Sequence, residues 1–510
     1  MSENGWSRRV GGRIVEDVVA DDRRFYRALA ARDARFDGVF FVGVTSTGVY
    51  CRPICPARTP KSSNCRFFTT PAEAEQAGFR PCLRCRPELA PGSAPVDDAA
   101  RIAALMVERL ETTGADERRG LEAIADEFEL SARQIRRIVR QELGVPPIQL
   151  LLTRRLLLAK QLLTETTLPI TEIAFASGFA SLRRFNDAFT RRYRMPPTRL
   201  RRHAADRADA APDGGTLTLR LAYRPPYDWP GILDFLRARA FAGVEHVTDS
   251  AYARTVRIGA STGWLRVTHA RAQHAVIVEL PSHLAPALPA VLRRVRALFD
   301  LDARPDVIAR HLRRDARLAA GVRATPGLRV PGAFNGFELG VRAILGQQVT
   351  VKGATTLCGR LAQDFGDPII TPFADLCRLS PTSDRLATAR VTDIARHGIV
   401  GARARSLVAL AKAHVSGAID LDRRDAPRPD DVISRLLDVP GIGPWTAQYI
   451  AMRALAWPDA FPKEDVAVRR ELGNATATEA DTLAESWRPW RSYAVMHLWR
   501  MAAARAASVG

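Results

Sequence analysis

The chain of 510 residues has no apolar run long enough to cross a bilayer, and residues 1–24 lack the apolar core of a signal peptide. It also lacks a repeat array. Acidic residues are outnumbered, because 75 Lys and Arg face 55 Asp and Glu and leave a formal net charge of +20. These features argue against membrane, secreted and solenoid proteins. They predict a cytoplasmic, nucleoid-associated chain that binds a polyanion, although a GC-rich genome that favours Arg would explain part of the excess.

A chain of this length exceeds what one hydrophobic core can hold, so we expect three or four domains. Two stretches without periodicity, residues 86–95 and 204–215, are typical of linkers. They separate a small cysteine-rich head, a helical middle region and a large C-terminal half that becomes helical from about Pro281. Apolar alternation and one short apolar run predict the strands. The expected strands cover residues 38–44, 217–221, 255–258 and 275–278.

Five of the seven cysteines crowd into one short segment. Cys51 and Cys55 are separated by three residues, Cys82 and Cys85 by two, and 26 residues lie between the pairs. Two such pairs can close a tetrahedral thiolate site of the kind that holds structural Zn²⁺. Disulfides or unligated buried thiols are the alternative, which a reducing cytosol disfavours. Cys65 has no partner at this spacing and is expected to pack in a core.

The residues around these cysteines, 47–58 and 77–85, closely resemble the N-terminal domain of the Ada family. The resemblance implies that the four cysteines bind one zinc ion and that Cys51 irreversibly accepts a methyl group from a methylated DNA phosphate. Zinc keeps thiols ionised at neutral pH, so a bound thiolate can remain nucleophilic. Methylation would also remove one negative charge and weaken the repulsion between this centre and DNA. A purely structural zinc is the alternative.

Two helix-turn-helix patterns occupy the middle region. In the first, residues 121–131 lead into an arginine-rich helix over 133–140, and in the second, residues 170–179 lead into 183–189. A long amphipathic helix over 150–164 lies between them. A helical bundle with an exposed arginine face is the alternative, which the presence of two copies disfavours.

This arrangement resembles the AraC-type DNA-binding domain, whose two recognition helices enter successive major grooves. The sequence departs from that family where the second recognition helix ends, because Arg194 replaces the usual glycine. A left-handed residue other than glycine is costly, so this helix end could be reshaped. The resemblance implies that five arginines face DNA: Arg133, Arg136, Arg137, Arg183 and Arg184.

The C-terminal half contains a glycine-flanked turn between two helices, residues 440–444, and Asp465 follows Trp445 by twenty residues. Such a turn can present backbone N–H groups to a DNA phosphate, and a simple tight turn is the alternative. With the motifs over 223–229, 337–349 and 487–494, it resembles the AlkA family of 3-methyladenine DNA glycosylases. The likeness extends over almost all of residues 216–505.

This second resemblance implies a small α+β domain of the TATA-binding type followed by an all-α helix-hairpin-helix glycosylase domain. Gly441, Ile442 and Gly443 would then hold the DNA backbone through their N–H groups, directly or through a bound monovalent cation. No cysteine follows the hairpin, so we expect no iron–sulfur cluster.

Asp465 stands at the position of the family's catalytic aspartate. An N3- or N7-alkylated purine already carries positive charge, so the difficulty lies at the sugar, which develops oxocarbenium character. A nearby carboxylate stabilises that cation and can orient or deprotonate the attacking water. Capping of the following helix is the alternative role, and one side chain can fill both. Glu464 is a weaker candidate, and Lys463 would lower the pKa of Asp465.

Trp445 occupies the position at which bifunctional relatives carry a lysine nucleophile, so we expect hydrolysis without strand cleavage. The target purine must be flipped out of the duplex into a pocket. The resemblance implies that Trp445, Tyr449 and Trp499 form aromatic walls that attract a cationic base, with Phe235 and Gln347 beside them. For any one of these aromatic residues taken alone, an ordinary core position is the alternative.

Together the resemblances identify the chain as an Ada–AlkA type fusion of the adaptive response to alkylation: multidomain and mostly α. Its expected partners are alkylated and promoter duplex DNA and, for an activator, RNA polymerase, and we expect a monomer. The Pro-Cys-His-Arg motif of O6-alkylguanine methyltransferases is absent. A regulator with a catalytically silent glycosylase half is the strongest alternative. The expected segments are a zinc-binding head over 1–90, a double helix-turn-helix over 96–203, a linker over 204–215, an α+β domain over 216–290 and a glycosylase domain over 291–510.

Overall fold

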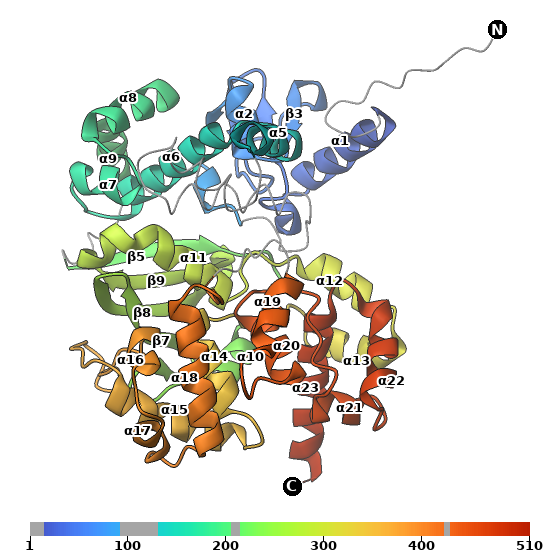
Figure 1. Cartoon of the computed structure of the whole chain (residues 1–510). Coiled ribbons are helices and arrows are strands. Elements are labelled where there is room, and N and C mark those ends of the chain that lie inside the picture. Colours follow the sequence, from blue (N-terminus) through green and yellow to red (C-terminus); the bar gives the residue numbers. More distant parts are fainter. Residues whose placement is uncertain (1–14, 92–130, 206–214, 423–428, 510) are drawn as a thin grey trace. The chain divides into compact units, whose positions relative to one another are not determined.

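The computed structural model describes residues 15–91, 131–205, 215–422 and 429–509 (Figure 1). The chain divides into two compact units, residues 1–214 and 215–510. Residues 92–95 and 206–214 of the predicted linkers, and the first helix of the first helix-turn-helix, over 121–130, lie outside the described residues. The linker prediction is wrong for residues 86–91, because Pro87–Leu89 forms a short 3-10 helix in which Pro87 and Leu89 are buried. Within the described part, no helix combines the length and apolar character that a membrane span requires.

The head of the first unit is built on a small sheet with the strand order β3-β1-β2-β4. β1 pairs with β2 and β3 in antiparallel fashion, whereas β4 runs parallel to β2. A capping box formed by Thr70 and Glu73 starts the helix that packs on this sheet. The elements are α1 (Val15–Ala30), β1 (Phe41–Val44), β2 (Val49–Cys51), β3 (Cys65–Phe68), α2 (Pro71–Gln76) and β4 (Arg80–Pro81).

The described part of the middle region, residues 131–205, is helical, as the sequence predicts. Ser181 accepts a hydrogen bond from the Arg184 backbone N–H and caps the second recognition helix. That helix ends at Arg194 with φ of 57°, so the left-handed ending survives without the usual glycine and is not reshaped. The described helices are α5 (Ala132–Leu143), α6 (Pro147–Glu165), α7 (Ile170–Ala176), α8 (Leu182–Tyr193) and α9 (Pro197–Ala205).

Buried polar contacts join the head to the long helix α6. The Thr153 hydroxyl donates to Glu75 at 2.6 Å, and the Tyr50 hydroxyl donates to the same carboxylate at 3.1 Å. Lys160 reaches from α6 to the carbonyl oxygen of Cys82 at 2.9 Å. These partners are buried, so the head and the helical region share one polar interior.

The second unit begins with a five-stranded antiparallel sheet of order β5-β9-β8-β7-β6. The three strands predicted here lie within β5, β7 and β9. Asp228 caps α10 through the Gly231 N–H. The strands are β5 (Thr216–Ala222), β6 (Glu245–Val247), β7 (Ala251–Ile258), β8 (Ser261–Ala270) and β9 (Ala275–Pro281), and the accompanying helices are α10 (Trp229–Arg237) and α11 (Leu288–Leu298).

The rest of this unit is helical and is organised around α14, whose residues are all buried. α14 packs against α15, α18 and α20, and the predicted hairpin joins α19 to α20. The helices are α12 (Pro305–Leu312), α13 (Ala316–Ala324), α14 (Gly336–Leu345), α15 (Val351–Phe365), α16 (Ser383–Ala387), α17 (Val391–Ala395), α18 (Gly401–Val415), α19 (Pro429–Leu437), α20 (Pro444–Arg453), α21 (Val466–Glu471), α22 (Ala477–Ala484) and α23 (Arg491–Val509).

Candidate active site and metal centre

The hairpin between α19 and α20 is a tight turn with two glycines in different situations. Gly441 has φ of +83°, and a Cβ there would collide with the Ser406 hydroxyl, so the fold itself requires glycine. Gly443 has φ of −94° and open space where a Cβ would stand, so the fold tolerates a side chain. The Ile442 N–H is donated to the Val439 carbonyl at 3.0 Å and closes the turn.

The Asp465 carboxylate is fixed by three N–H donors. One oxygen accepts from the Val468 backbone at 3.0 Å and from the Trp499 indole at 3.1 Å, and the other accepts from the Trp445 indole at 2.8 Å. Asp465 is therefore the cap of α21, and its side chain is 9% exposed. The two roles weighed from the sequence are compatible, because capping uses only part of one oxygen's capacity.

The aromatic residues form a stack beside this carboxylate. The rings of Trp445 and Tyr449 are parallel within 11° at 5.2 Å, and Tyr449 lies 6.2 Å from Trp499. Phe235 stacks on Trp499 at 6.3 Å, one layer behind the residues that border the cleft. One carboxylate and several π-faces thus meet in one place, contributed by α10, α20, α21 and α23.

A cleft of about 900 Å³ that reaches the hairpin is lined by Asp465, Trp445, Tyr449 and Trp499, whereas Phe235, expected in the lining, does not border it. Its wall includes Gln347, which donates to the Gly441 carbonyl at 2.8 Å and to the Thr446 hydroxyl at 3.0 Å. Gln347 therefore ties the hairpin to the cleft as well as lining it. A cleft of this size is large enough for a nucleobase and part of its sugar.

Four charged residues in or near the cleft were not fully predicted from the sequence. Lys463 pairs with Asp481 at 2.8 Å on the surface, a partner that the sequence did not indicate. Glu464 borders the cleft, and its Oε2 is buried without a hydrogen-bond partner in the described part. Arg239 and Arg342 line the inner end of the cleft and were not anticipated. Arg239 lies just beyond the end of α10, where no helical spacing signals its position.

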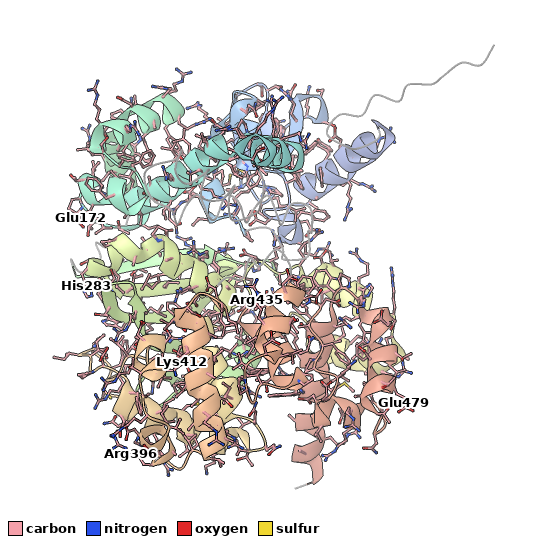
Figure 2. The ribbon with its side chains drawn as sticks, in the orientation of Figure 1. Glu172, His283, Arg396, Lys412, Arg435 and Glu479 are labelled. Carbon is pink, nitrogen blue, oxygen red and sulfur yellow. The ribbon has the colours of Figure 1, made fainter. Side chains whose placement is uncertain are left out.

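Three basic side chains and one acidic side chain, Asp438, line the hollows on the outside of the hairpin. Arg405 and Lys412 of α18 line a hollow that ends at Pro440 and Gly441, and Arg435 of α19 borders a second hollow next to Pro440. All three side chains are exposed, and Figure 2 shows Lys412 and Arg435 on this part of the unit. A basic rim around a turn with accessible backbone suits a phosphate backbone.

The five predicted DNA-contacting arginines of the first unit are all exposed. Arg133, Arg136 and Arg137 lie on α5, and Arg183 and Arg184 lie at the start of α8. Exposure is necessary for DNA contact and does not establish it.

The four predicted cysteines come together at the end of β2 and around β4. The sulfur atoms of Cys51, Cys55, Cys82 and Cys85 all lie within 4.8 Å of one another. Backbone N–H groups are donated to the sulfur of Cys85 from Arg52 and to the sulfur of Cys82 from Arg84, each at 3.3 Å. Four convergent thiols with N–H support fit a tetrahedral thiolate metal site. Cys65 lies outside the cluster and packs against its core.

The comparisons with known families cover most of the chain. The model described as the metal binding domain of Ada matches residues 24–88, and a helix-turn-helix domain model matches 124–203. The AlkA N-terminal domain model matches 218–335. The model of the HhH-GPD superfamily of base excision DNA repair proteins matches 341–491, which includes the hairpin and Asp465.

Curated relatives agree with this order. The chain is 39% identical over 485 residues to a probable bifunctional transcriptional activator/DNA repair enzyme AlkA of Mycobacterium tuberculosis, covering 94% of this chain and 96% of the relative. It is 38% identical to DNA-3-methyladenine glycosylase 2 of Escherichia coli, covering 55% of this chain and 95% of that protein. It is 31% identical to the bifunctional transcriptional activator/DNA repair enzyme AdaA of Bacillus subtilis, covering 39% of this chain and 91% of that protein. The chain therefore belongs to the family of bifunctional transcriptional activators and DNA repair enzymes that join an Ada-type head to an AlkA-type glycosylase.

Proposed function

We propose that the second unit hydrolyses the N-glycosidic bond of alkylated purines of the 3-methyladenine and 7-methylguanine type, with Asp465 as the catalytic carboxylate. The observation that carries this proposal is the position of Asp465, held by two indole N–H groups at the wall of an aromatic cleft that reaches the hairpin. Three fixed donors orient the carboxylate before the reaction, so no reorganisation is needed as charge develops on the sugar.

In this proposal the residues divide the work. Gly443, open in front of its backbone, and Gly441 donate N–H groups to the DNA strand, while the Ile442 N–H stays in the turn. The flipped base enters the cleft against the aromatic wall formed by Trp445, Tyr449 and Trp499. Asp465 stabilises the oxocarbenium ion and orients water for attack on the anomeric carbon. A monovalent cation at the hairpin remains a proposal.

Base release from methylated duplex DNA tests the glycosylase proposal. Asp465→Asn should lower the single-turnover rate by about 10²–10³-fold or more, while Glu464→Gln, which removes the adjacent cleft carboxylate, should retain most of the rate. The unfolding midpoint of each variant checks that the cap of α21 survives. No base release by the wild type would favour the regulator with a silent glycosylase half.

We propose further that the four-cysteine cluster holds one zinc ion and that Cys51 accepts a methyl group from a methylphosphotriester. Exposure does not single out this thiol, because Cys51 and Cys82 are each 9% exposed. Hydrogen bonding does distinguish it. Cys55, Cys82 and Cys85 each accept a backbone N–H, whereas the described residues supply Cys51 with none. A thiolate without such donors keeps more of its nucleophilicity.

Zinc, when bound, would keep these thiols ionised at neutral pH. In the proposed transfer the Cys51 sulfur forms a bond to the methyl carbon as the bond from carbon to phosphate oxygen breaks, and the phosphodiester leaves with its negative charge. Mass spectrometry after incubation with methylphosphotriester DNA should show one added methyl group on Cys51, and Cys51→Ser should abolish it. A purely structural metal would leave Cys51 unmodified.

In this family the first unit would read promoter DNA through α5 and α8, and the charge lost on methylation of Cys51 would raise its DNA affinity. Contact with RNA polymerase and a monomeric state are parts of the same proposal. Promoter binding by unmodified and methylated protein, at several salt concentrations, tests the switch.

A further inference from the structure

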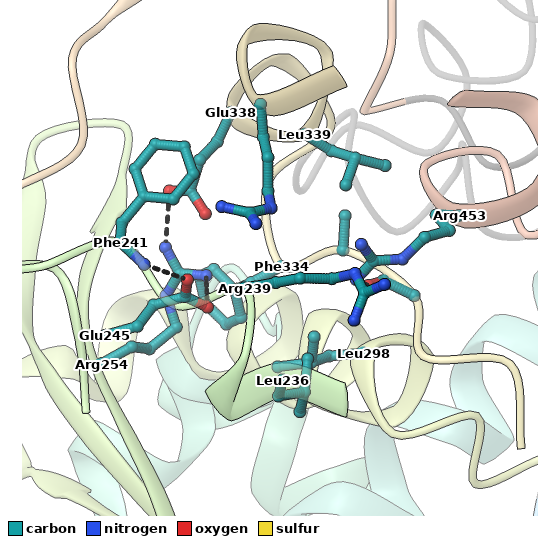
Figure 3. Close-up of a pocket in the computed structure, with 13 residues that line it drawn as sticks. Leu236, Arg239, Phe241, Glu245, Arg254, Leu298, Phe334, Glu338, Leu339 and Arg453 are labelled. Atoms are coloured by element: carbon teal, nitrogen blue, oxygen red, sulfur yellow. Dashed lines mark hydrogen bonds and ion pairs between the residues drawn. The ribbon is translucent and has the colours of Figure 1, made fainter. Parts of the chain in front are cut away.

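Three arginines close the inner end of the base cleft. Arg239 and Arg342 line the large cleft that also contains Asp465, and both line a small inner cavity of about 30 Å³ behind it. Arg453, at the end of α20, lines the inner cavity as well. Figure 3 shows Arg239 and Arg453 reaching toward one another across this cavity. The base cleft thus has a carboxylate on one wall and a cationic group at its inner end.

The partners of these three arginines are uncharged groups. Arg453 donates to the Tyr449 hydroxyl at 2.6 Å and to the carbonyls of Pro331 and Gly332 at 2.7 and 3.0 Å. Arg342 donates to the Thr355 hydroxyl at 3.1 Å. Arg239 lies 3.7 Å over the Phe235 ring and donates to the Phe235 carbonyl at 3.3 Å.

The carboxylates nearby form ion pairs with a fourth arginine. Arg254 pairs with Glu338 at 2.7 Å and with Glu245 at 3.8 Å. Four arginines and two glutamates line the inner cavity, so the wall keeps a surplus of two positive charges. Burying such charge without a carboxylate partner is costly, and Arg342 and Arg453 are 7% and 3% exposed. A fold that needed only hydrogen bonds to carbonyls could use neutral donors.

The field of this surplus reaches into the base cleft. Burial raises the pKa of Tyr449, but the positive charges of Arg453, Arg239 and Arg342 outweigh burial and hold that pKa below its usual value. Burial lowers the pKa of Arg239 to about 10, so Arg239 remains charged at neutral pH. The Tyr449 ring is a wall of the cleft, so positive potential is present where the base is expected.

The reaction moves charge along this field. When the bond from the anomeric carbon to the base nitrogen breaks, both electrons stay with the base and the positive charge appears on the sugar. An alkylated purine cation is repelled by the arginines before the bond breaks and is neutral afterwards. A base that starts neutral leaves as an anion and is attracted to them. In both cases the transition state is favoured over the ground state, which is the condition for acceleration.

We infer that Arg239 and Arg342, backed by Arg453, form a cationic wall of the base cleft that drives positive charge from the base to the sugar beside Asp465. The wall opposes the attraction between the aromatic faces and a cationic base. The wall therefore lowers the affinity for the cationic base and raises the rate of bond cleavage. This inference rests on the proposed function in that the cleft receives the flipped base.

Single-turnover excision separates this role from simple binding. The substrates are two identical duplexes that contain either 7-methylguanine, a cation, or hypoxanthine, which is neutral. Arg239→Gln should slow excision of both bases by at least about tenfold and leave affinity for the 7-methylguanine duplex equal or tighter. Arg239→Lys, which keeps the charge, should retain more of the rate. The matched control is Arg237→Gln, because Arg237 pairs with Asp234 and Asp249 on the surface of the same segment.

Unchanged rates for Arg239→Gln, or a loss of affinity alone, would overturn the inference. A second measurement needs no variant, so it holds even if Arg239→Gln does not fold. Inhibition of the wild type by free 7-methylguanine, which is neutral, is compared with inhibition by 7,9-dimethylguaninium, an ion of similar shape, at a mildly acidic pH where that ion keeps its N1 proton and its positive charge. The wall predicts tighter binding of the neutral base, and tighter binding of the cation would contradict it. If the wild type releases no base at all, the proposed function fails instead.

Discussion

Lys160 donates a hydrogen bond of 2.9 Å from its ammonium group to the backbone carbonyl oxygen of Cys82, one of the four clustered cysteines. The same ammonium group pairs with Glu88 at 2.6 Å, and both side chains are 1% exposed. Helix α6, which lies between the two recognition helices α5 and α8, is therefore bonded directly to the proposed metal centre. This contact is specific and costly to break, because Lys160 and Glu88 are both buried and removing Lys160 takes away one of the two ionic partners of Glu88.

Lys160→Met should destabilise the first unit by about 3 kcal/mol, the lower end of the range for breaking a buried ion pair, since the buried Glu88 carboxylate keeps Arg86 as an ionic partner. Denaturant unfolding and the rate of zinc release to a chelator measure the effect. The double variant Lys160→Met, Glu88→Gln should recover part of the loss. Lys61→Met, at an exposed lysine of the head, is the control. If Lys160→Met were as stable as Lys61→Met, the ion pair between Lys160 and Glu88 would not hold the head on α6.

The indole donors of Asp465 can be removed without removing an aromatic ring. Trp445→Phe and Trp499→Phe each take one N–H from the carboxylate and keep a ring in the stack. Because hydrogen bonds to charged groups contribute about 1.5–3 kcal/mol, each change should lower the single-turnover rate by about 10–100-fold. Trp264→Phe, at a ring that packs on Phe373 away from the cleft, should leave the rate unchanged. If these variants changed KM and left the rate of bond cleavage unchanged, both indoles would serve only to stack on the base.

How far the sequence predicts this site depends on the range of the interactions involved. The cysteine spacing, the hairpin glycines and Asp465 are local motifs, and the cysteines and the cleft residues converge in space as those motifs indicate. The pairing of Lys463 with Asp481 depends on how the segment before α21 packs near α22, so the sequence does not reveal this partner. The bond from Lys160 to Cys82 spans 78 residues and has no local signature.

The cationic wall shows a second reason why prediction stops short. Arg453 follows Tyr449 by four residues on α20, and a sequence pattern of that kind usually indicates a solvated helix face. Only the packed structure reveals that Arg453 points inward and that the nearby carboxylates pair with Arg254. Arg194 is a related case, since the replacement of the usual glycine predicted a cost at a left-handed position, and the folded helix end holds Arg194 there with φ of 57°.

Trp445 also predicts the reaction class. With an indole in place of an amine, borohydride should trap no covalent complex between the wild type and DNA, and the product strand should remain uncleaved. Trp445→Lys places an amine on α20 next to Asp465, since the indole nitrogen it replaces lies 2.8 Å from that carboxylate. This variant should give a borohydride-trapped adduct with DNA that contains an abasic site. A trapped adduct with the wild type would show that another lysine acts as nucleophile.

Stability should fall with acidity through His497. Burial, with a further contribution from Arg500, lowers the pKa of His497 to about 4 from its ordinary 6.5. Between these two pKa values His497 is protonated in the unfolded chain but not in the folded chain. The contribution of His497 to the free energy of unfolding is therefore complete above pH 6.5 and is lost as the pH falls toward 4, by up to about 3 kcal/mol. The free energy of unfolding of His497→Gln should depend less on pH over this range than that of the wild type. The control His283→Gln changes an exposed histidine and should show the same pH dependence of stability as the wild type. If all three proteins show the same pH dependence, His497 is not its cause.

The two hairpin glycines should separate stability from DNA binding. Gly441→Ala forces a left-handed φ of +83° on alanine and drives its Cβ into the Ser406 hydroxyl, so we expect a loss of stability of about 1–3 kcal/mol. Gly443→Ala fits the backbone and meets no atom within 4 Å, so the unfolding midpoint should hardly change. Its methyl group would stand where the DNA backbone has to approach the hairpin, and the Kd for duplex DNA should rise severalfold. Unchanged affinity of a normally folded Gly443→Ala protein would mean that the strand does not approach Gly443, and the proposed contact between hairpin and phosphate would have to be given up.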